Sequence, residues 1–355
     1  MYRYFLSALL LAGVLSAVPP VAKAQSALLD LPRESQHAKI SQKIGITEIT
    51  IDYSRPLMKG RKVFGGLEPY GKVWRVGANE NTTISFSDPV TVEGQPIPAG
   101  IYGLHMIPGE SEWTVVFSKA NSSWGSYSYD QKEDALRVTV KPQTSEPHEA
   151  LTFDFDDPKP NGATIAMRWD KVAVPFQVEV NTDQMVAESL RKQLRGRVQY
   201  EWQGPGEAAD YLLAHKLNLE DALKYANASI QNEERFENVM TKANILDTLH
   251  RTDEATSTRN KALAMANAVQ LHTYGRQLQQ QGKQEQAFDA FRTNIKKNPS
   301  HWLVHNELAR LACAKGDFDT AVKEMKLSVA GADPSNKPMV EGLLTRLEKK
   351  EDINK

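Results

Sequence analysis

The feature of this sequence that most constrains its fold is a change of hydrophobic period near residue 180. Before that point, short segments such as 49–53 and 113–117 alternate apolar and polar residues. After it, apolar residues recur at helical spacing in a sequence rich in Ala, Leu, Lys, Glu and Gln. Because a strand repeats every two residues and a helix about every 3.6, the change predicts a β domain followed by an α domain.

The β half is predicted to be an antiparallel β-sandwich or barrel, and we place it at residues 25–180. Strict alternation argues against a parallel sheet, whose buried strands read as continuous apolar runs. His105 falls in one further expected strand, with its orientation open. The alternating segments are 49–53, 82–86, 113–117, 136–140, 151–155, 165–169 and 172–178.

The α half is predicted to start with a connecting helix and linker at 181–204, in which Asp183 is a candidate N-cap. The Gly204-Pro205-Gly206 run is expected to break the chain, because Gly and Pro are poor helix formers. From 205 to 355 the sequence repeats itself. Gly282 and Gly316 are 34 residues apart, and so are two alanines that follow them at 287 and 321.

The segment YGRQLQQQGKQEQAFDAFRTNIKKNP, residues 274–299, resembles a tetratricopeptide repeat. A second copy follows it, and Ala222 and Ala255 fit two degenerate copies upstream, so three to four units are expected. The resemblance implies a concave groove that holds a protein partner rather than a catalytic site. Its packing positions are occupied by Gly275, Leu278, Gly282, Ala287, Phe291 and Pro299, and in the next copy by Leu308, Ala309, Gly316 and Ala321.

The first 24 residues have the layout of a secretory signal peptide. An Arg precedes an apolar run, 5–18, that ends before two prolines and an Ala-Lys-Ala pattern. That run is shorter than the roughly 20 residues that span a bilayer. We therefore expect cleavage after Ala24 and export to the periplasm or the medium. No membrane span is expected in the mature chain.

Charge and cysteine content narrow the class of partner. Removal of residues 1–24 takes away two basic residues, which leaves 41 basic against 44 acidic residues, a net charge of −3. Nucleic-acid binding needs clustered Lys and Arg, so nucleic acid is not an expected partner. Cys313 is the only cysteine, so an intrachain disulfide is excluded and the fold depends on its core.

Several unusual segments occur in order in the β half: YSRP (53–56), KGRKVFG (59–65), VWRVGANE (73–80), PAGIYGL (98–104) and EWTVVF (112–117). Together they resemble the exported family known as domain of unknown function 2911, over about residues 33–180. The resemblance implies export and a β-rich domain. It implies no established activity, so any site has to be argued from the residues themselves.

Five polar residues of these segments form a candidate ligand site. The planar guanidinium of arginine suits carboxylate, phosphate or sugar recognition. If the segments converge, they line a polar pocket rimmed by Tyr53, Tyr70 and Trp74. Two alternatives stay open, an architectural corner of the β fold and an Arg–Glu network that pins loops together. The five residues are Arg55, Arg61, Arg75, Asn79 and Glu80.

A second candidate site follows from the repeat register. His272 and Arg276 are expected to project into the groove from one unit, and Asn306 and Arg310 from the next, 34 residues on. Two stacked arginines suit an acidic segment or a chain-terminal carboxylate of a protein partner. The alternative is that both arginines bond acidic neighbours in adjacent helices.

Catalytic and metal signatures are weak. A nucleophile elbow is absent, and His301 and His305 share a helix face without an evident third ligand. No cofactor and no metal site is predicted. The favoured hypothesis is an exported, non-enzymatic binding protein of the cell envelope. The alternatives are an envelope hydrolase with a cleft near 55–80 and a purely structural envelope scaffold.

Overall fold

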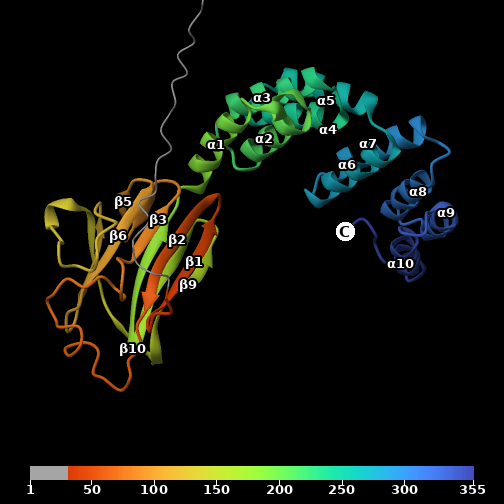
Figure 1. Ribbon diagram of the computed structural model, residues 1–355. Coiled ribbons are helices and arrows are strands. Elements are labelled where there is room, and N and C mark those ends of the chain that lie inside the picture. The colour runs from red at the N-terminus through yellow and green to blue at the C-terminus, as the bar shows by residue number, and fades with distance from the viewer. Residues whose placement is uncertain (1–30) are drawn as a thin grey trace, which may run out of the picture.

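The computed structural model of the protein describes residues 31–355, so the predicted signal peptide lies outside the described residues. Two antiparallel sheets are followed by a curved array of helices (Figure 1). The predicted order of a β domain and then an α-helical array is confirmed.

The β domain consists of two antiparallel sheets. The six-stranded sheet has the order β1-β2-β3-β6-β7-β8 and the four-stranded sheet the order β5-β4-β10-β9. The strands of the first are Gln36–Ile44, Thr47–Arg55, Thr83–Phe86, Gly100–Ile107, Trp113–Ser118 and Asp134–Val140, in that order. Those of the second are Gln95–Ile97, Val90–Val92, Gly162–Glu179 and Gln143–Lys159.

One apolar core lies between the sheets. It includes Ile51 and Trp113 from the larger sheet and Trp169 and Phe176 from the smaller one, all nearly inaccessible to solvent. The strand alternation predicted from the sequence is thus the alternation between this core and the outside. The two segments 165–169 and 172–178, predicted as separate strands, belong to the single strand β10. It remains continuous through an irregular pairing near Asp170, whose φ is +56°.

Ten α-helices follow in the described chain. Their bounds, from α1 to α10, are Thr182–Gln193, Gln203–Ala214, Leu219–Asn232, Phe236–Thr248, Thr252–Met265, Ala268–Gln280, Gln284–Lys297, Trp302–Ala314, Phe318–Gly331 and Lys337–Glu348. Helices α2 to α9 pack as four antiparallel hairpins, α2/α3, α4/α5, α6/α7 and α8/α9, and α10 packs on α9.

The repeat positions explain the hairpin geometry. A Cβ on Gly275 would lie 2.3 Å from a ring carbon of Phe291, so the lack of a side chain lets α6 and α7 approach closely. Gly282 and Gly316 have φ values of +74° and +76° at the turns of their hairpins. That conformation favours glycine, which accounts for the 34-residue spacing of the two glycines.

The junction between the halves differs from the sequence expectation in two details. The N-cap of α1 is Asn181, whose side chain accepts a hydrogen bond from the Gln184 amide, and Asp183 lies in the first turn instead. The Gly204-Pro205-Gly206 run does not break the chain but lies in the first turns of α2. Proline is tolerated there because the first N–H groups of a helix have no partner within it.

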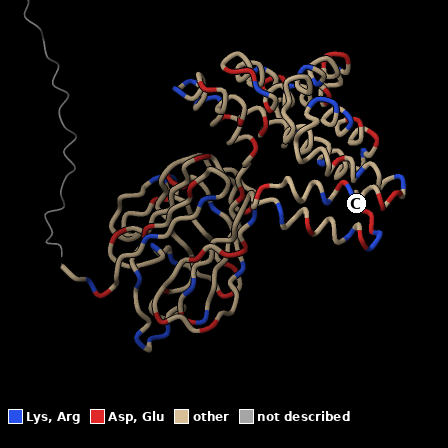
Figure 2. The backbone as a smooth tube through the Cα atoms, turned by 90° about the vertical axis from the view of Figure 1, so that its right-hand side faces the viewer, with Lys and Arg blue, Asp and Glu red and all other residues tan. Residues whose placement is uncertain are grey.

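Basic and acidic residues are interspersed along both halves (Figure 2). Within residues 31–355, every helix is too short or too polar to cross a lipid bilayer.

Candidate functional site

The five predicted ligand residues of the β domain do not form one pocket. Arg61 and Arg75 line a cleft of about 230 Å³, whereas Asn79 and Glu80 line a neighbouring cleft of about 550 Å³. Arg55 lines neither of them. Its Nε donates to the carbonyl oxygen of Leu151 at 3.0 Å and ties β2 to β9.

Asn79 and Glu80 hold the segment that leads into β1. The Asn79 side-chain amide donates to the carbonyl oxygen of Ser35 at 3.1 Å, and the Glu80 carboxylate pairs with Arg33 at 2.6 Å. The backbone of Asn79 has a φ of +60°, which an asparagine tolerates better than most residues. These contacts fit the alternative in which this motif pins loops together.

The Trp74 part of the motif belongs to the core. Its indole stacks on Trp169 with the ring centroids 5.7 Å apart, and its backbone pairs with Met106. A Cβ on Gly77 would lie 2.8 Å from the Thr82 hydroxyl and 3.0 Å from the Ser54 carbonyl oxygen. Glycine is therefore needed here for close backbone approach.

Glu68, which the sequence reasoning did not single out, lies in the same cleft as Arg61 and Arg75. Burial raises the pKa of its carboxyl group to about 7, although the nearby Arg75 charge acts in the opposite direction. The sequence offered only one weak signal, a lone acid in a Gly- and Pro-flanked segment. A carboxyl group with a raised pKa is the kind of group that the hydrolase alternative requires.

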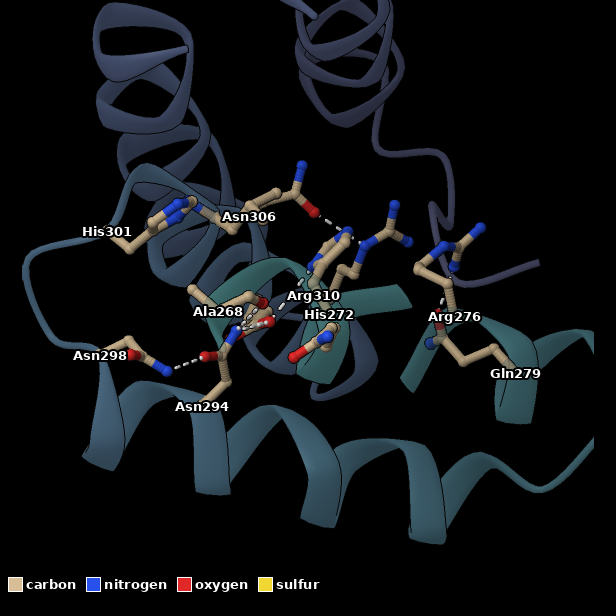
Figure 3. Close-up of polar contacts among 12 residues, drawn as sticks. Ala268, His272, Arg276, Gln279, Asn294, Asn298, His301, Asn306 and Arg310 are labelled. Atoms are coloured by element: carbon tan, nitrogen blue, oxygen red, sulfur yellow. Dashed lines mark hydrogen bonds and ion pairs between the residues drawn. The ribbon is translucent and has the colours of Figure 1, made fainter. Parts of the chain in front are cut away.

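The four predicted groove residues come together on the facing helices α6 and α8 (Figure 3). His272 and Arg276 are half-buried on α6, and Asn306 and Arg310 are buried on α8. The Arg276 guanidinium donates to the side chain of Gln279, and the Nε of Arg310 donates to Asn306 at 2.8 Å. The repeat register thus predicted which residues share this face.

Neither arginine of this pair forms an ion pair with a residue between 31 and 355. The alternative in which both arginines bond acidic neighbours in adjacent helices is therefore not observed. Arg310 is only 3% exposed, and burial lowers the pKa of its guanidinium to about 9. The nearby positive charge of Arg276 acts in the same direction. A buried cation whose partners are neutral oxygens is costly, so its place on this face of α8 needs a reason.

Glu307, a second residue that the sequence reasoning missed, is fully buried on α8 next to Asn306. Its Oε1 accepts from the Asn294 amide at 2.6 Å and lies 3.1 Å from the Nδ1 of His272. Burial raises the pKa of Glu307 to about 8 and lowers that of His272 to about 3. At pH 7 these two groups therefore meet as a neutral hydrogen bond.

The segment after α10 occupies the inner side of the array. In Figure 1 the end marked C lies inside the curve, facing α6. Arg346 donates to the carbonyl oxygen of Asp352 and Arg310 to that of Ile353, both at 2.6 Å. The Gln279 amide donates to the Asn354 side chain at 2.9 Å, and Ile353 is 1% exposed. The groove residues therefore hold the main chain of an irregular peptide segment.

The remaining histidine and cysteine side chains have local roles. His105 is buried on the side of β6 covered by the loop after β7 and lies 2.9 Å from the Ser126 hydroxyl. The His301 ring caps α8, and His305 pairs with Glu324 at 2.8 Å, so the two do not converge. Cys313 is buried and free. In the described part of the chain, no three His, Cys, Asp or Glu side chains are placed to hold a metal ion.

Comparison with known families confirms the resemblance of the β domain. Residues 35–178 match the family described as Protein of unknown function (DUF2911). Comparison with curated proteins finds no match.

Three solved structures are similar to the chain. The crystal structure of MamA has 15% identity and a TM-score of 0.29, over 42% of this chain and 88% of that one. A tetratricopeptide repeat protein from Parabacteroides merdae has 14% identity and a TM-score of 0.30, over 48% and 66%. YrrB, described as a TPR protein with an unusual peptide-binding site, has 16% identity and a TM-score of 0.27, over 47% and 88%.

Proposed function

We propose that this protein is an exported, non-enzymatic binding protein of the cell envelope whose helical array holds a peptide segment of a protein partner. The observation that carries the proposal is the segment 352–354 on the inner face of the array. Two consecutive carbonyl oxygens of that segment accept hydrogen bonds from Arg346 and Arg310. Side chains that bind main-chain oxygens hold a peptide through its backbone, and the side chains around them add the preference for one sequence over another.

The proposal explains why a charged residue, Arg310, is buried on this face of the array. Arg310 lies against the Asn306 amide and a peptide carbonyl, so it retains a charge that a partner peptide with a carboxylate would satisfy better. Charge-assisted hydrogen bonds are about twice as strong as neutral ones. A partner segment that places an acidic side chain against Arg310 is therefore preferred, whereas the Asp352 carboxylate of the chain's own segment accepts from the Asn354 amide instead.

The test uses the chain without residues 351–355 and a labelled peptide of the sequence Glu-Asp-Ile-Asn-Lys, with fluorescence anisotropy as the readout. We expect saturable binding, and a loss of at least tenfold in affinity with Arg310→Met, since a hydrogen bond to a charged group contributes about 1.5–3 kcal/mol. The matched control is Arg292→Met, because Arg292 is exposed on α7 and pairs with Asp289. Equal binding by all three chains would contradict the proposal.

The same peptide tests the competition between partner and segment. The intact chain should bind the labelled peptide more weakly than the shortened chain, because its own segment occupies the inner face. Urea unfolding of both chains shows whether the shortened array remains folded. If the shortened array is folded but binds no peptide, the proposal that the array binds a peptide is contradicted.

Export is the second part of the proposal, and it is supported by the apolar run and the Ala-Lys-Ala pattern before residue 25. Fractionation of the native cells should place the protein outside the cytoplasm, with a mature chain that begins at Gln25. A cytoplasmic chain that retains Met1 would contradict this part and leave peptide binding untouched.

A further inference from the structure

The cleft of about 230 Å³ in the β domain is not used by peptide binding to the helical array. Its wall includes charged and aromatic side chains from segments far apart in the sequence, among them Lys59, Arg61, Glu68, Arg75 and Trp169. A space of that size accommodates a small molecule or one end of a larger one. Its chemistry is set by the charges that face it.

Hydrogen bonds to the main chain fix the Arg61 side chain and the turn that carries Glu68. The Arg61 guanidinium donates to the carbonyl oxygens of Leu57 at 2.6 Å and Met58 at 2.9 Å. The Glu68 amide donates to the Val63 carbonyl oxygen at 2.9 Å, which closes the turn before it. Arg75 follows Trp74, which is buried in the core. Such a site is pre-organised, so little ordering entropy is lost on binding.

The cleft has an excess of positive charge. Lys59 is paired with Glu34, but Arg61 and Arg75 have no carboxylate partner among residues 31–355. The Nε of Arg75 is buried and, within the same residues, makes no hydrogen bond. Glu68 is largely protonated below about pH 7, because burial raises the pKa of its carboxyl group. The cleft wall then carries the positive charges of Lys59, Arg61 and Arg75 and only the negative charge of Glu34.

The Arg75 guanidinium has little freedom to leave the cleft. A Cβ on Gly125 would lie 2.5 Å from its NH1 atom, so the Gly125 backbone closes one side of the guanidinium. Trp169, which also lines the cleft, is fully buried and stacks on Trp74. Because the Nε is inaccessible, an anion in the cleft would be held through the two terminal nitrogens of the guanidinium, which are not among the buried unpaired atoms.

We propose that this cleft binds a small oxyanion, a carboxylate or a phosphate group, with Arg75 as its anchor and Arg61 at its rim. The protonated carboxyl group of Glu68 donates a hydrogen bond to the anion. Ionisation of Glu68 places a negative charge beside the ligand and expels it. Binding therefore decreases as the pH rises through the titration of this carboxyl group.

The test is an NMR titration of the mature chain with sodium acetate and, separately, with sodium sulfate at constant ionic strength, following the amides of residues 59–77. Sulfate represents the tetrahedral phosphate group without titrating near neutral pH. We expect affinity to fall about tenfold between pH 6 and pH 8, because the neutral fraction of a group with a pKa of about 7 falls by that factor.

Two variants assign the effect to its residues. Arg75→Gln should reduce the affinity at least tenfold at pH 6, and the same change at the exposed Arg292 should leave it unaltered. Glu68→Gln keeps a donor and removes the charge, so it should abolish the pH dependence and retain binding. Thermal unfolding confirms that each variant is folded.

The outcomes separate the possible sources of the anion. Binding of acetate alone identifies a carboxylate ligand, and binding of sulfate alone a phosphate ligand. The proposal is overturned if neither anion produces shifts that depend on Arg75, or if Glu68→Gln leaves the pH dependence intact.

Discussion

The β domain and the helical array are each stabilised by a different kind of core. The β domain has one core that joins both sheets and contains large aromatic side chains such as Trp113 and Trp169. The helical array is divided into small clusters rich in alanine, and it buries a polar network around Glu307 and Arg310. Its packing involves neighbouring helices, whereas the β core joins strands far apart in the chain.

This difference predicts where each half tolerates change. Residues that share one core are coupled, so truncation of one large core side chain should lower the stability of the whole β domain. Stacked repeats behave nearly as a sum of local units, so damage should remain close to its site. The array can therefore carry an energetically costly buried arginine on its inner face while neighbouring units supply stability.

The largest expected effect is that of Trp169→Ala. Trp169 is fully buried, stacks on Trp74 and meets Phe64 edge to face, so the change should destabilise the β domain by about 3–5 kcal/mol. Urea unfolding should show the β transition shifted and the helical circular dichroism transition unchanged. The control is Trp124→Ala, because Trp124 is 53% exposed. Equal shifts of both transitions would show that the halves unfold as one unit.

A smaller and more local effect is expected for Gly275→Ala. The new Cβ would lie 2.3 Å from Phe291, so α6 and α7 have to separate, at a cost of about 1–3 kcal/mol. Hydrogen exchange should increase mainly in α6 and α7. Gly342→Ala on α10 meets no atom within 4 Å and should be neutral or stabilising by up to about 1 kcal/mol. Exchange that increases throughout the array would argue against independent repeats.

The smallest effect, within the window of pH 6.5 to 8 in which it is measured, is the pH dependence produced by Glu307. Its pKa in the folded protein, about 8, lies above the usual value of 4.5, so the native state binds a proton that the unfolded state releases. Its stabilisation is complete below pH 4.5 and is lost as the pH rises towards 8, by at most about 1.4 kcal/mol per pH unit. With Glu307→Gln, the free energy of unfolding of the helical array should vary less with pH between pH 6.5 and 8.

That pH window is chosen because His272 acts in the opposite direction below it. Burial lowers the pKa of His272 to about 3, so its stabilisation is present above pH 6.5 and decreases as the pH falls towards 3. The control for Glu307→Gln is the same change at the exposed Glu341. An unchanged slope in Glu307→Gln would show that the carboxyl group is ionised in the folded array.

The two candidate sites differ in how far the sequence predicted them. In the array, the 34-residue register placed His272 and Arg276 opposite Asn306 and Arg310, because equivalent repeat positions share a face. In the β domain, separate Gly- and Pro-flanked segments were expected to converge on one pocket for Arg61, Arg75 and Glu80, and the fold separates them into two clefts. Whether either set binds a ligand or a partner stays a prediction.

The sequence by itself determined the order of the two domains, most of the strands and the repeat register, because period, turn glycines and small packing residues are local properties. Tertiary structure alone decided which groups lose contact with water. Glu68, Glu307 and Arg310 acquire their shifted pKa values from burial by distant segments. It also decided that 352–354 lies against α8, because a hydrogen bond between Arg310 and Ile353 joins residues 43 apart and leaves no periodic signal.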